Sequence, residues 1–386
     1  METIRPGFST GVFFAGSQQM RKPDNKIWAG VVIAAALAAG FIAVVRMDSG
    51  GKEGSGLPKE YLYELEEFEK IDPSKILYEQ TSETIKTNLT HSRAICVGSD
   101  GGVYVAGDNS IIVFKGGERR TIELSVEPTC IAVLADGKIL TGLGSRIVVL
   151  AADGRKVADW PHVSEKSIFT SIAFDRDFVF VADAGLALIH RFDYDGKLID
   201  SFGAADPLEN KPGFVIPSPY FDIAMAPDGL LRVVNPGRCL IEAWTRDGHR
   251  EWAWGKRSVK LEDFCGCCNP VNIAILPDGG FVTVEKGLVR VKVYDGDGNF
   301  VGVAAGPRQL QWAGPVRVCE RVEDCGAKGF DAAVDGDGRI YVLDTVNNVV
   351  RIFEKKSNIL AEWWHGLPAR ESHGQDGRAT YVFSNG

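Results

Sequence analysis

Apolar and polar positions alternate most regularly in residues 329–354, which read GFDAAVDGDGRIYVLDTVNNVVRIFE. Three short apolar runs, 332–334, 340–343 and 349–353, are separated by an Asp-Gly turn and a second polar turn. Asp-Gly between apolar runs is a strong hairpin signal, because Gly adopts a positive φ without steric cost. The pattern predicts three antiparallel strands, and residues 359–363 are a candidate for a fourth.

The same register recurs six times along the chain. A residue at the start of a short apolar strand, here called x, is followed six positions later by Asp. The pairs are Ala94/Asp100, Cys130/Asp136, Ser171/Asp177, Asp222/Asp228, Asn272/Asp278 and Asp331/Asp337. Successive aspartates lie 36 to 59 residues apart, which brackets the propeller-blade period of about 40–50 residues. The sequence therefore predicts an all-β fold, a six-bladed β-propeller over residues 81–366 with a C-terminal tail at 367–386. Residues 76–85 are too short for a further blade but are a candidate for a strand that helps to close the ring.

Residues 341–353, YVLDTVNNVVRIF, resemble the core of an NHL repeat. The resemblance implies that each repeat is one β-propeller blade. Some propellers with similar repeats are enzymes, including peptide-amidating lyases and lactonases that resemble gluconolactonase, and these hold a metal ion in the channel. Their ligand sets do not map onto this sequence beyond Asp222, Asn272 and Asp331.

An apolar segment without charge, residues 27–45, precedes the repeats and has the length of a membrane-spanning helix. Arg21, Lys22 and Lys26 flank it on the N-terminal side, and the positive-inside rule places that side in the cytoplasm. We expect residues 1–26 to be cytoplasmic, 27–45 to be a transmembrane helix, and 46–80 to be a linker with an amphipathic helix. The propeller is then extracytoplasmic, in the periplasm. A cleaved signal peptide is the alternative.

Composition fits this picture and excludes one class of partner. The chain has 386 residues, 45% of them hydrophobic, and a formal net charge of −8. This hydrophobic content is typical of a folded domain with a large core. The negative charge argues against nucleic acid as a partner.

Strand parity divides the turns of the predicted propeller between two faces. In a meander, all the Asp-Gly turns after first strands lie on one face. The other face carries the blade-to-blade connections and the turns between second and third strands. We call this second face the functional face, because loops on a rigid scaffold usually carry the site. Its turns follow Gly107, Gly142, Asp183, Asn235, Glu285 and Asp344.

Six of the eight cysteines fall on the functional face of blades 4 to 6. They are Cys239, Cys265, Cys267, Cys268, Cys319 and Cys325. In an oxidising compartment an even number of cysteines favours disulfides. Three thiolates within four residues, plus one from another loop, would also provide the four ligands of a zinc ion or an iron–sulfur cluster. A reactive thiol near Arg317 or Arg321 is the third reading.

Three polar residues occupy the x positions of neighbouring blades. Asp222, Asn272 and Asp331 are expected to converge at the channel mouth on the functional face. Their oxygens would suit a hard cation such as calcium. The alternative, which the residue types favour, is a polar channel whose strand ends are capped by Asx side chains.

The sequence thus supports a membrane-anchored, NHL-type propeller that binds a protein partner in the cell envelope. In this hypothesis the functional face of blades 4 to 6 is the binding surface. One alternative is a redox or metalloprotein with a Cys-ligated centre for electron transfer. The other is a metal-dependent lyase or hydrolase that uses the channel mouth. No phosphate loop, nucleophile elbow or HExxH motif is present.

Overall fold

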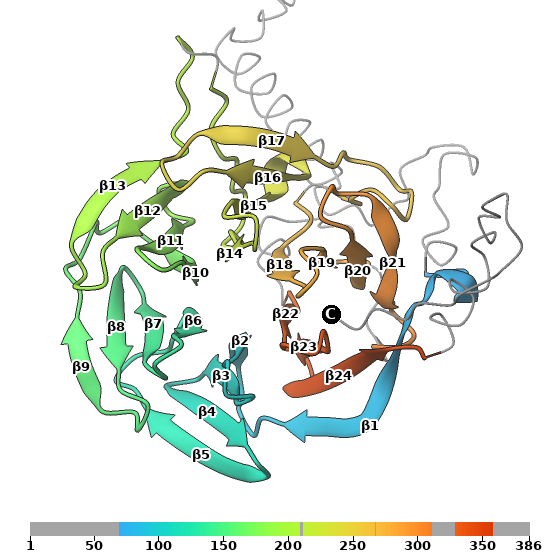
Figure 1. Cartoon of the computed structure of the whole chain (residues 1–386), viewed down its shortest axis with the longest axis horizontal. Helices are drawn as coiled ribbons and strands as arrows, with labels where there is room; N and C mark the ends of the chain where they lie inside the picture. Colours follow the sequence, from blue (N-terminus) through green and yellow to red (C-terminus); the bar gives the residue numbers. More distant parts are fainter. Residues whose placement is uncertain (1–68, 209–210, 267, 311–328, 358–386) are drawn as a thin grey trace, which may run out of the picture. The chain divides into compact units, whose positions relative to one another are not determined.

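A computed structural model describes residues 69–208, 211–266, 268–310 and 329–357 of the chain. These residues form six four-stranded antiparallel sheets arranged in a ring (Figure 1). The predicted all-β, six-bladed β-propeller is therefore confirmed. Among the described residues there is no helix with the length and hydropathy needed to cross a bilayer. The predicted transmembrane segment at residues 27–45 lies outside the described residues.

The first three blades are regular meanders in chain order. Blade 1 contains β2 (Ser92–Val97), β3 (Val103–Gly107), β4 (Ser110–Lys115) and β5 (Glu118–Glu123). Blade 2 contains β6 (Cys130–Val133), β7 (Ile139–Leu143), β8 (Arg146–Leu150) and β9 (Lys156–Asp159). Blade 3 contains β10 (Phe169–Phe174), β11 (Val179–Asp183), β12 (Leu188–Phe192) and β13 (Leu198–Phe202).

Blades 4 and 5 follow the same order, and blade 6 departs from it. Blade 4 contains β14 (Ile223–Met225), β15 (Leu231–Asn235), β16 (Leu240–Trp244) and β17 (Arg250–Trp254). Blade 5 contains β18 (Asn272–Ile275), β19 (Phe281–Glu285), β20 (Arg290–Tyr294) and β21 (Phe300–Ala305). Blade 6 contains β22 (Asp331–Val334), β23 (Ile340–Asp344), β24 (Val349–Lys355) and, from the N-terminal side, β1 (Tyr78–Lys86). Short 3₁₀ turns are η2 (Pro73–Lys75) and η3 (Pro236–Arg238).

Strand β1 closes the ring by pairing with the outer edge of β24. The register runs from Tyr78 opposite Lys355 to Lys86 opposite Val349, with a bulge between Gln80 and Thr84. The fourth position of blade 6 thus belongs to β1, and residues 359–363, the other candidate for a fourth strand, lie outside the described residues. This pairing gives the backbone N–H and C=O groups on the outer edge of β24 their hydrogen-bond partners. The propeller begins at Tyr78, within the predicted linker at 46–80.

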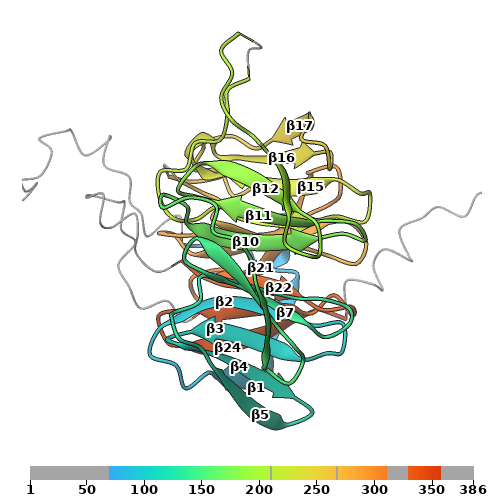
Figure 2. The same ribbon diagram turned by 90° about the vertical axis from the view of Figure 1, so that its left-hand side faces the viewer.

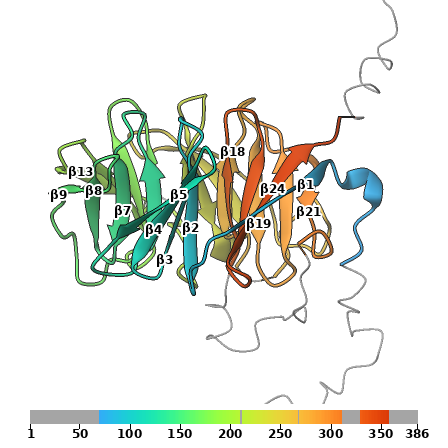
Figure 3. The same ribbon diagram turned by 90° about the horizontal axis from the view of Figure 1, so that it is seen from below.

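The turns lie on the two faces that strand parity predicts. Strands run from one face of the ring to the other, and the turns gather at both ends (Figure 3). In blade 6 the Asp-Gly turn needs glycine, since Gly338 has a φ of +80°. The carboxylate of Asp335 accepts hydrogen bonds from the amides of Asp337 and Arg339 and holds this turn. A longer connection after β13 projects from the ring and carries a bridge between Asp206 and Lys211 (Figure 2).

The core consists of apolar layers between neighbouring sheets. Each of the six clusters in the described residues spans one blade junction. Blades 6 and 1, for example, bury Leu343 and Val350 against Val105 and Ile112. A single sheet cannot bury both faces, so each blade depends on its two neighbours. Ring closure is therefore a condition for burial of the first and last blades.

Truncation of Tyr78 tests the contribution of β1 to the ring. The Tyr78 side chain is buried in the core between blades 5 and 6, whereas that of Glu79 is exposed. We expect Tyr78→Ala to lower the free energy of unfolding by about 3–5 kcal/mol. The matched variant Glu79→Ala should change it by less than about 0.5 kcal/mol. Denaturant unfolding measures both, and equal losses in the two variants would contradict a structural role for β1.

Candidate functional site

A channel with a volume of about 1130 Å³ runs through the ring and is lined by its innermost strands. At the functional face its mouth includes Arg93, Thr129 and Tyr220, and at the opposite face Pro227 and Pro277. Small x+2 residues are also part of the channel lining: Cys96, Ala132, Ala173, Ala224 and Ala333. The channel wall is thus more apolar than polar, and four of its polar residues occupy x positions: Ser171, Asp222, Asn272 and Asp331.

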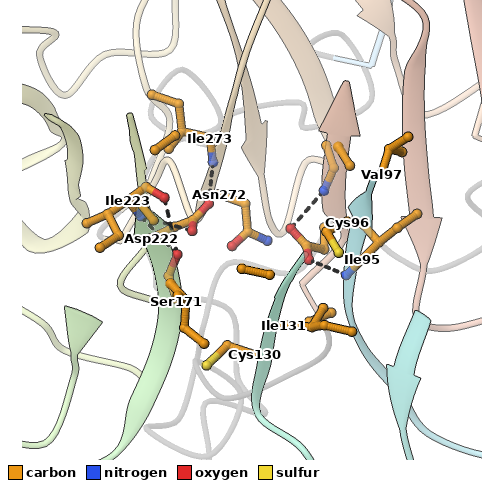
Figure 4. A pocket seen from close by; sticks show the side chains of 18 of the residues that line it. Ile95, Cys96, Val97, Cys130, Ile131, Ser171, Asp222, Ile223, Asn272 and Ile273 are labelled. Atoms are coloured by element: carbon orange, nitrogen blue, oxygen red, sulfur yellow. Dashed lines mark hydrogen bonds between the residues drawn. The ribbon is translucent and has the colours of Figure 1, made fainter. Parts of the chain in front are cut away.

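Asp222 stands at the start of β14 and joins blade 4 to blade 5. Its Oδ1 accepts a hydrogen bond from the Ile223 amide at 2.9 Å, and its Oδ2 accepts one from the Ile273 amide at 2.7 Å (Figure 4). The Ser171 hydroxyl donates to the carbonyl oxygen of Ile223 at 3.2 Å and so joins blade 3 to blade 4. Each of these side chains caps a strand end on a neighbouring blade.

Asp331 makes the equivalent link between blade 6 and blade 1. Its Oδ1 accepts from the Ala332 amide at 2.8 Å, and its Oδ2 accepts from the Ile95 amide at 2.9 Å. Asn272 donates from Nδ2 to the carbonyl oxygen of Phe330 at 2.5 Å, between blades 5 and 6. The structure therefore places Asp222, Asn272 and Asp331 on the channel wall at consecutive blade junctions. This is the strand-end capping that the residue types favour.

The electrostatics of the channel are set by two carboxyl groups. Burial raises the pKa of Asp222 to about 6. Burial and then the charge of Asp222 raise the pKa of Asp331 to about 8. Among the described lining residues the only Lys or Arg is Arg93, and its guanidinium is paired with Glu127 at 2.9 Å. The channel therefore favours a proton or another positive charge near these carboxyl groups.

The oxygens of Asp222, Asn272 and Asp331 are chemically suited to a cation. Their arrangement alone does not form a metal site. Each carboxylate oxygen accepts one backbone hydrogen bond, and Asp222 also accepts a side-chain hydrogen bond from Ser171. One lone pair on each Asp331 oxygen is left for a ligand. Within the described residues, no group of three or more His, Cys, Asp or Glu side chains is placed to hold a metal ion. Calcium binding by Asp222, Asn272 and Asp331 stays a prediction.

Two functional-face loops that carry cysteines come together at blades 4 and 5. Cys239 follows η3 with a φ of +57°, is buried, and donates from Sγ to the carbonyl oxygen of Gly266 at 3.6 Å. The backbone amide of Cys265 donates to Glu285 at 2.9 Å. The contact brings Cys239 to the predicted cysteine loop of residues 265–268.

Within the described residues, Cys239 and Cys265 form no disulfide bond. Burial raises the pKa of Cys265, although Arg290 and Lys292 act in the opposite direction, which argues against a thiolate nucleophile at Cys265. Cys268, in the same loop, is buried. Cys267, Cys319 and Cys325 lie outside the described residues, so their metal or disulfide roles stay predictions.

A buried polar pair that the repeat register did not reveal recurs in four blades. It joins the last residue of the second strand to a residue of the third strand in each blade. The pairs are Asp183–His190, Asn235–Glu242, Glu285–Lys292 and Asp344–Arg351. The first members also accept amide hydrogen bonds from nearby loops, as Asp344 does from Val346 and Asn347. These pairs anchor the functional-face turns. The two members of each pair are separated by the same number of residues in all four blades, and this constant spacing is the sequence signal that could have revealed them.

Comparison with solved structures agrees with this architecture. A structure of streptogramin B lyase is 14% identical, with a TM-score of 0.50, and the match covers 74% of this chain and 100% of that chain. A structural-genomics protein of unknown function from Bacteroides thetaiotaomicron is 14% identical, with a TM-score of 0.51 and 72% of each chain covered. No protein-family model and no curated protein sequence matches the chain. At such identities the likeness shows the propeller fold alone.

The raised pKa of Asp331 predicts a pH-dependent stability. The folded state keeps the Asp331 proton to a higher pH than the unfolded state, where the pKa is near 3.8. This contribution is fully present below pH 3.8 and is lost as the pH rises towards about 8. In the unmodified protein we expect the free energy of unfolding to fall with rising pH by on the order of 1 kcal/mol per pH unit at its steepest. In Asp331→Asn this fall should be smaller.

Denaturant unfolding between pH 4 and pH 9 measures this slope. The control is Asp337→Asn, because Asp337 lies in the exposed Asp-Gly turn of the same blade. Its pH profile should match that of the unmodified protein. Identical slopes for the Asp331 variant and the unmodified protein would contradict the assignment.

Proposed function

We propose that this protein is a membrane-anchored, extracytoplasmic NHL-type propeller that binds a protein partner through its functional face. The observation that carries the proposal is the channel of about 1130 Å³ that reaches this face. The acidic groups of the described lining that form no ion pair, Asp222 and Asp331, come from blades 4 and 6, the part of the ring whose loops also carry the cysteines. A rigid ring with one chemically distinct face is typical of a binding scaffold.

The lining suggests which group of a partner enters the channel. Asp222, with a pKa of about 6, is the carboxyl group that carries negative charge at neutral pH, and a cation can replace the proton of Asp331. Arg93 at the mouth is already paired with Glu127. A lysine or arginine side chain of the partner would place its stem along the apolar wall and its charge beside the carboxylates. The partner segment is thus expected to be basic.

The location follows from the sequence and is part of the proposal. Residues 27–45 serve as a single N-terminal anchor, with Arg21, Lys22 and Lys26 on the cytoplasmic side. The propeller is then held at the periplasmic surface of the membrane, where its partner belongs to the cell envelope.

Photo-crosslinking in intact membranes tests which face binds. A benzoylphenylalanine at Val346 probes the functional face, since this exposed residue lies in the turn between β23 and β24. The matched position is Asp297, in the exposed turn between β20 and β21 on the opposite face. We expect a discrete protein adduct from Val346 and none from Asp297. Adducts from Asp297 alone, or from neither position, would contradict the proposal.

A second candidate function is a Cys-ligated redox or metal centre. The contact of the Cys239 thiol with Gly266 favours it, because it brings a thiol from another loop to the cysteine loop of residues 265–268. Soft thiolate ligands select zinc or an iron–sulfur cluster.

Metal analysis of anaerobically purified protein tests this candidate. A centre predicts bound iron or zinc that falls at least about tenfold in Cys239→Ser. The control is Cys96→Ser, because Cys96 lies in β2 of blade 1 and belongs to the channel wall. Protein without metal or visible absorbance, before any exposure to air, would refute the centre and leave the binding proposal intact.

A further inference from the structure

Blade 3 contains a serine, a histidine and an aspartate in hydrogen-bond contact across three adjacent strands. Ser201 on β13 lies with its Oγ 2.7 Å from Nδ1 of His190 on β12. Nε2 of the same imidazole lies 3.0 Å from Oδ2 of Asp183 on β11. His190 is 2% exposed and Asp183 is fully buried, whereas Ser201 lies on the exposed outer strand. A buried base therefore faces an accessible hydroxyl.

The surroundings of Asp183 fix which nitrogen of His190 carries the proton. Burial acts to raise the pKa of Asp183, but hydrogen bonds from His190 and from backbone amides hold it below its usual value. An ionised carboxylate only accepts, so Nε2 of His190 donates to it. Nδ1 is then the acceptor of the Ser201 proton. This arrangement orders nucleophile, base and orienting carboxylate as covalent catalysis requires.

The repeat does not explain the serine. The Asp183–His190 pair occupies the buried-pair position that blades 4 to 6 fill with Asn235–Glu242, Glu285–Lys292 and Asp344–Arg351. Opposite the second member, the fourth strands of these blades carry Ala253, Val303 and Thr84. Among these four blades only blade 3 combines a base with a hydroxyl. The scaffold needs the pair, but it does not need Ser201.

We propose that Ser201 is a base-activated nucleophile that takes an acyl group from an ester. Ser201 Oγ attacks the carbonyl carbon while its proton passes to Nδ1 of His190. The bond from carbon to the leaving oxygen then breaks, and His190 returns the proton to that oxygen. The products are an acylated Ser201 and a free alcohol, so the step needs no further reactant. Asp183 is a positioning residue that acts through His190.

A second constellation in the same region provides an internal comparison. Ser145 Oγ lies 2.6 Å from Nδ1 of His162, and Nε2 of His162 lies 3.1 Å from Oε1 of Glu165. These side chains are open to water, because His162 is 40% exposed and Glu165 is 95% exposed. Water competes for an exposed base and weakens its orientation. Ser145 should therefore react far more slowly than Ser201.

A fluorophosphonate probe on the full chain tests the proposal. Its phosphorus replaces the carbonyl carbon and its fluoride replaces the leaving alcohol, so labelling reports the nucleophile. We expect one label per chain, mapped to Ser201 by peptide mass spectrometry. The label should be lost in Ser201→Ala and unchanged in Ser145→Ala.

Asp183→Asn separates positioning from folding. The asparagine keeps a carbonyl oxygen for the amides of Ile168, Gly185 and Leu186, which Asp183 Oδ1 serves. Its NH₂ group would face Nε2 of His190 and favour the tautomer that cannot accept the Ser201 proton. We expect labelling at least 100-fold slower at an unchanged Tm. An unlabelled Ser201, labelling of Ser201 no faster than of Ser145, or an unchanged rate in a folded Asp183→Asn variant would overturn the proposal.

Discussion

Pairing between β1 and β24 is the interaction on which the rest of this structure depends. It brings the strand nearest the N-terminus onto the last strand of the final repeat, from Tyr78 opposite Lys355 to Lys86 opposite Val349. Each blade buries its faces only against its neighbours, so an open ring would expose the apolar faces of blades 6 and 1. Closure also fixes the distance between opposite inner strands, and hence the channel that they enclose. The site is in this sense a product of the closed ring.

The same polar residues serve both the ring and its channel. Asp222 and Asp331 accept hydrogen bonds from backbone amides of the next blade, so their carboxyl groups help to hold neighbouring blades in register. This role requires burial, and burial is what raises the pKa of both groups. A positive charge brought by a ligand would lower the free-energy cost of ionising these buried carboxyl groups. The proposed preference for a basic partner would therefore depend on the same carboxyl groups that cap the inner strands.

The sequence predicted the blades because the Asp-Gly register repeats with every meander, and parity then assigned the loops to two faces. It suggested only weakly that the N-terminal segment closes the ring, because β1 lies outside the repeat and has no register of its own. Residues 359–363, which follow the last repeat directly, lie outside the described residues. Sequence reasoning brought Cys239 and the loop at 265–268 to one face, and the structure places them in contact.

Other features depend on contacts between strands that the sequence pattern does not predict. The x-position aspartates were predicted at the channel mouth, but their bonds to amides of the next blade depend on how adjacent blades pack. The alignment of Ser201 with His190 depends on the register between β12 and β13, which a bulge shifts. Neither is visible in hydrophobic periodicity, which reports burial of a position and not its polar partners.

The central claim is that the functional face, and not the Asp-Gly face, binds the partner. Hydrogen exchange measured on the full chain in native membranes and again after purification in detergent tests it most directly. The account predicts protection in membranes at functional-face segments around Tyr220 and Val346, with no change at the Asp-Gly turns around Gly248 and Gly298. Protection confined to the Asp-Gly turns, or identical exchange in both preparations, would contradict it.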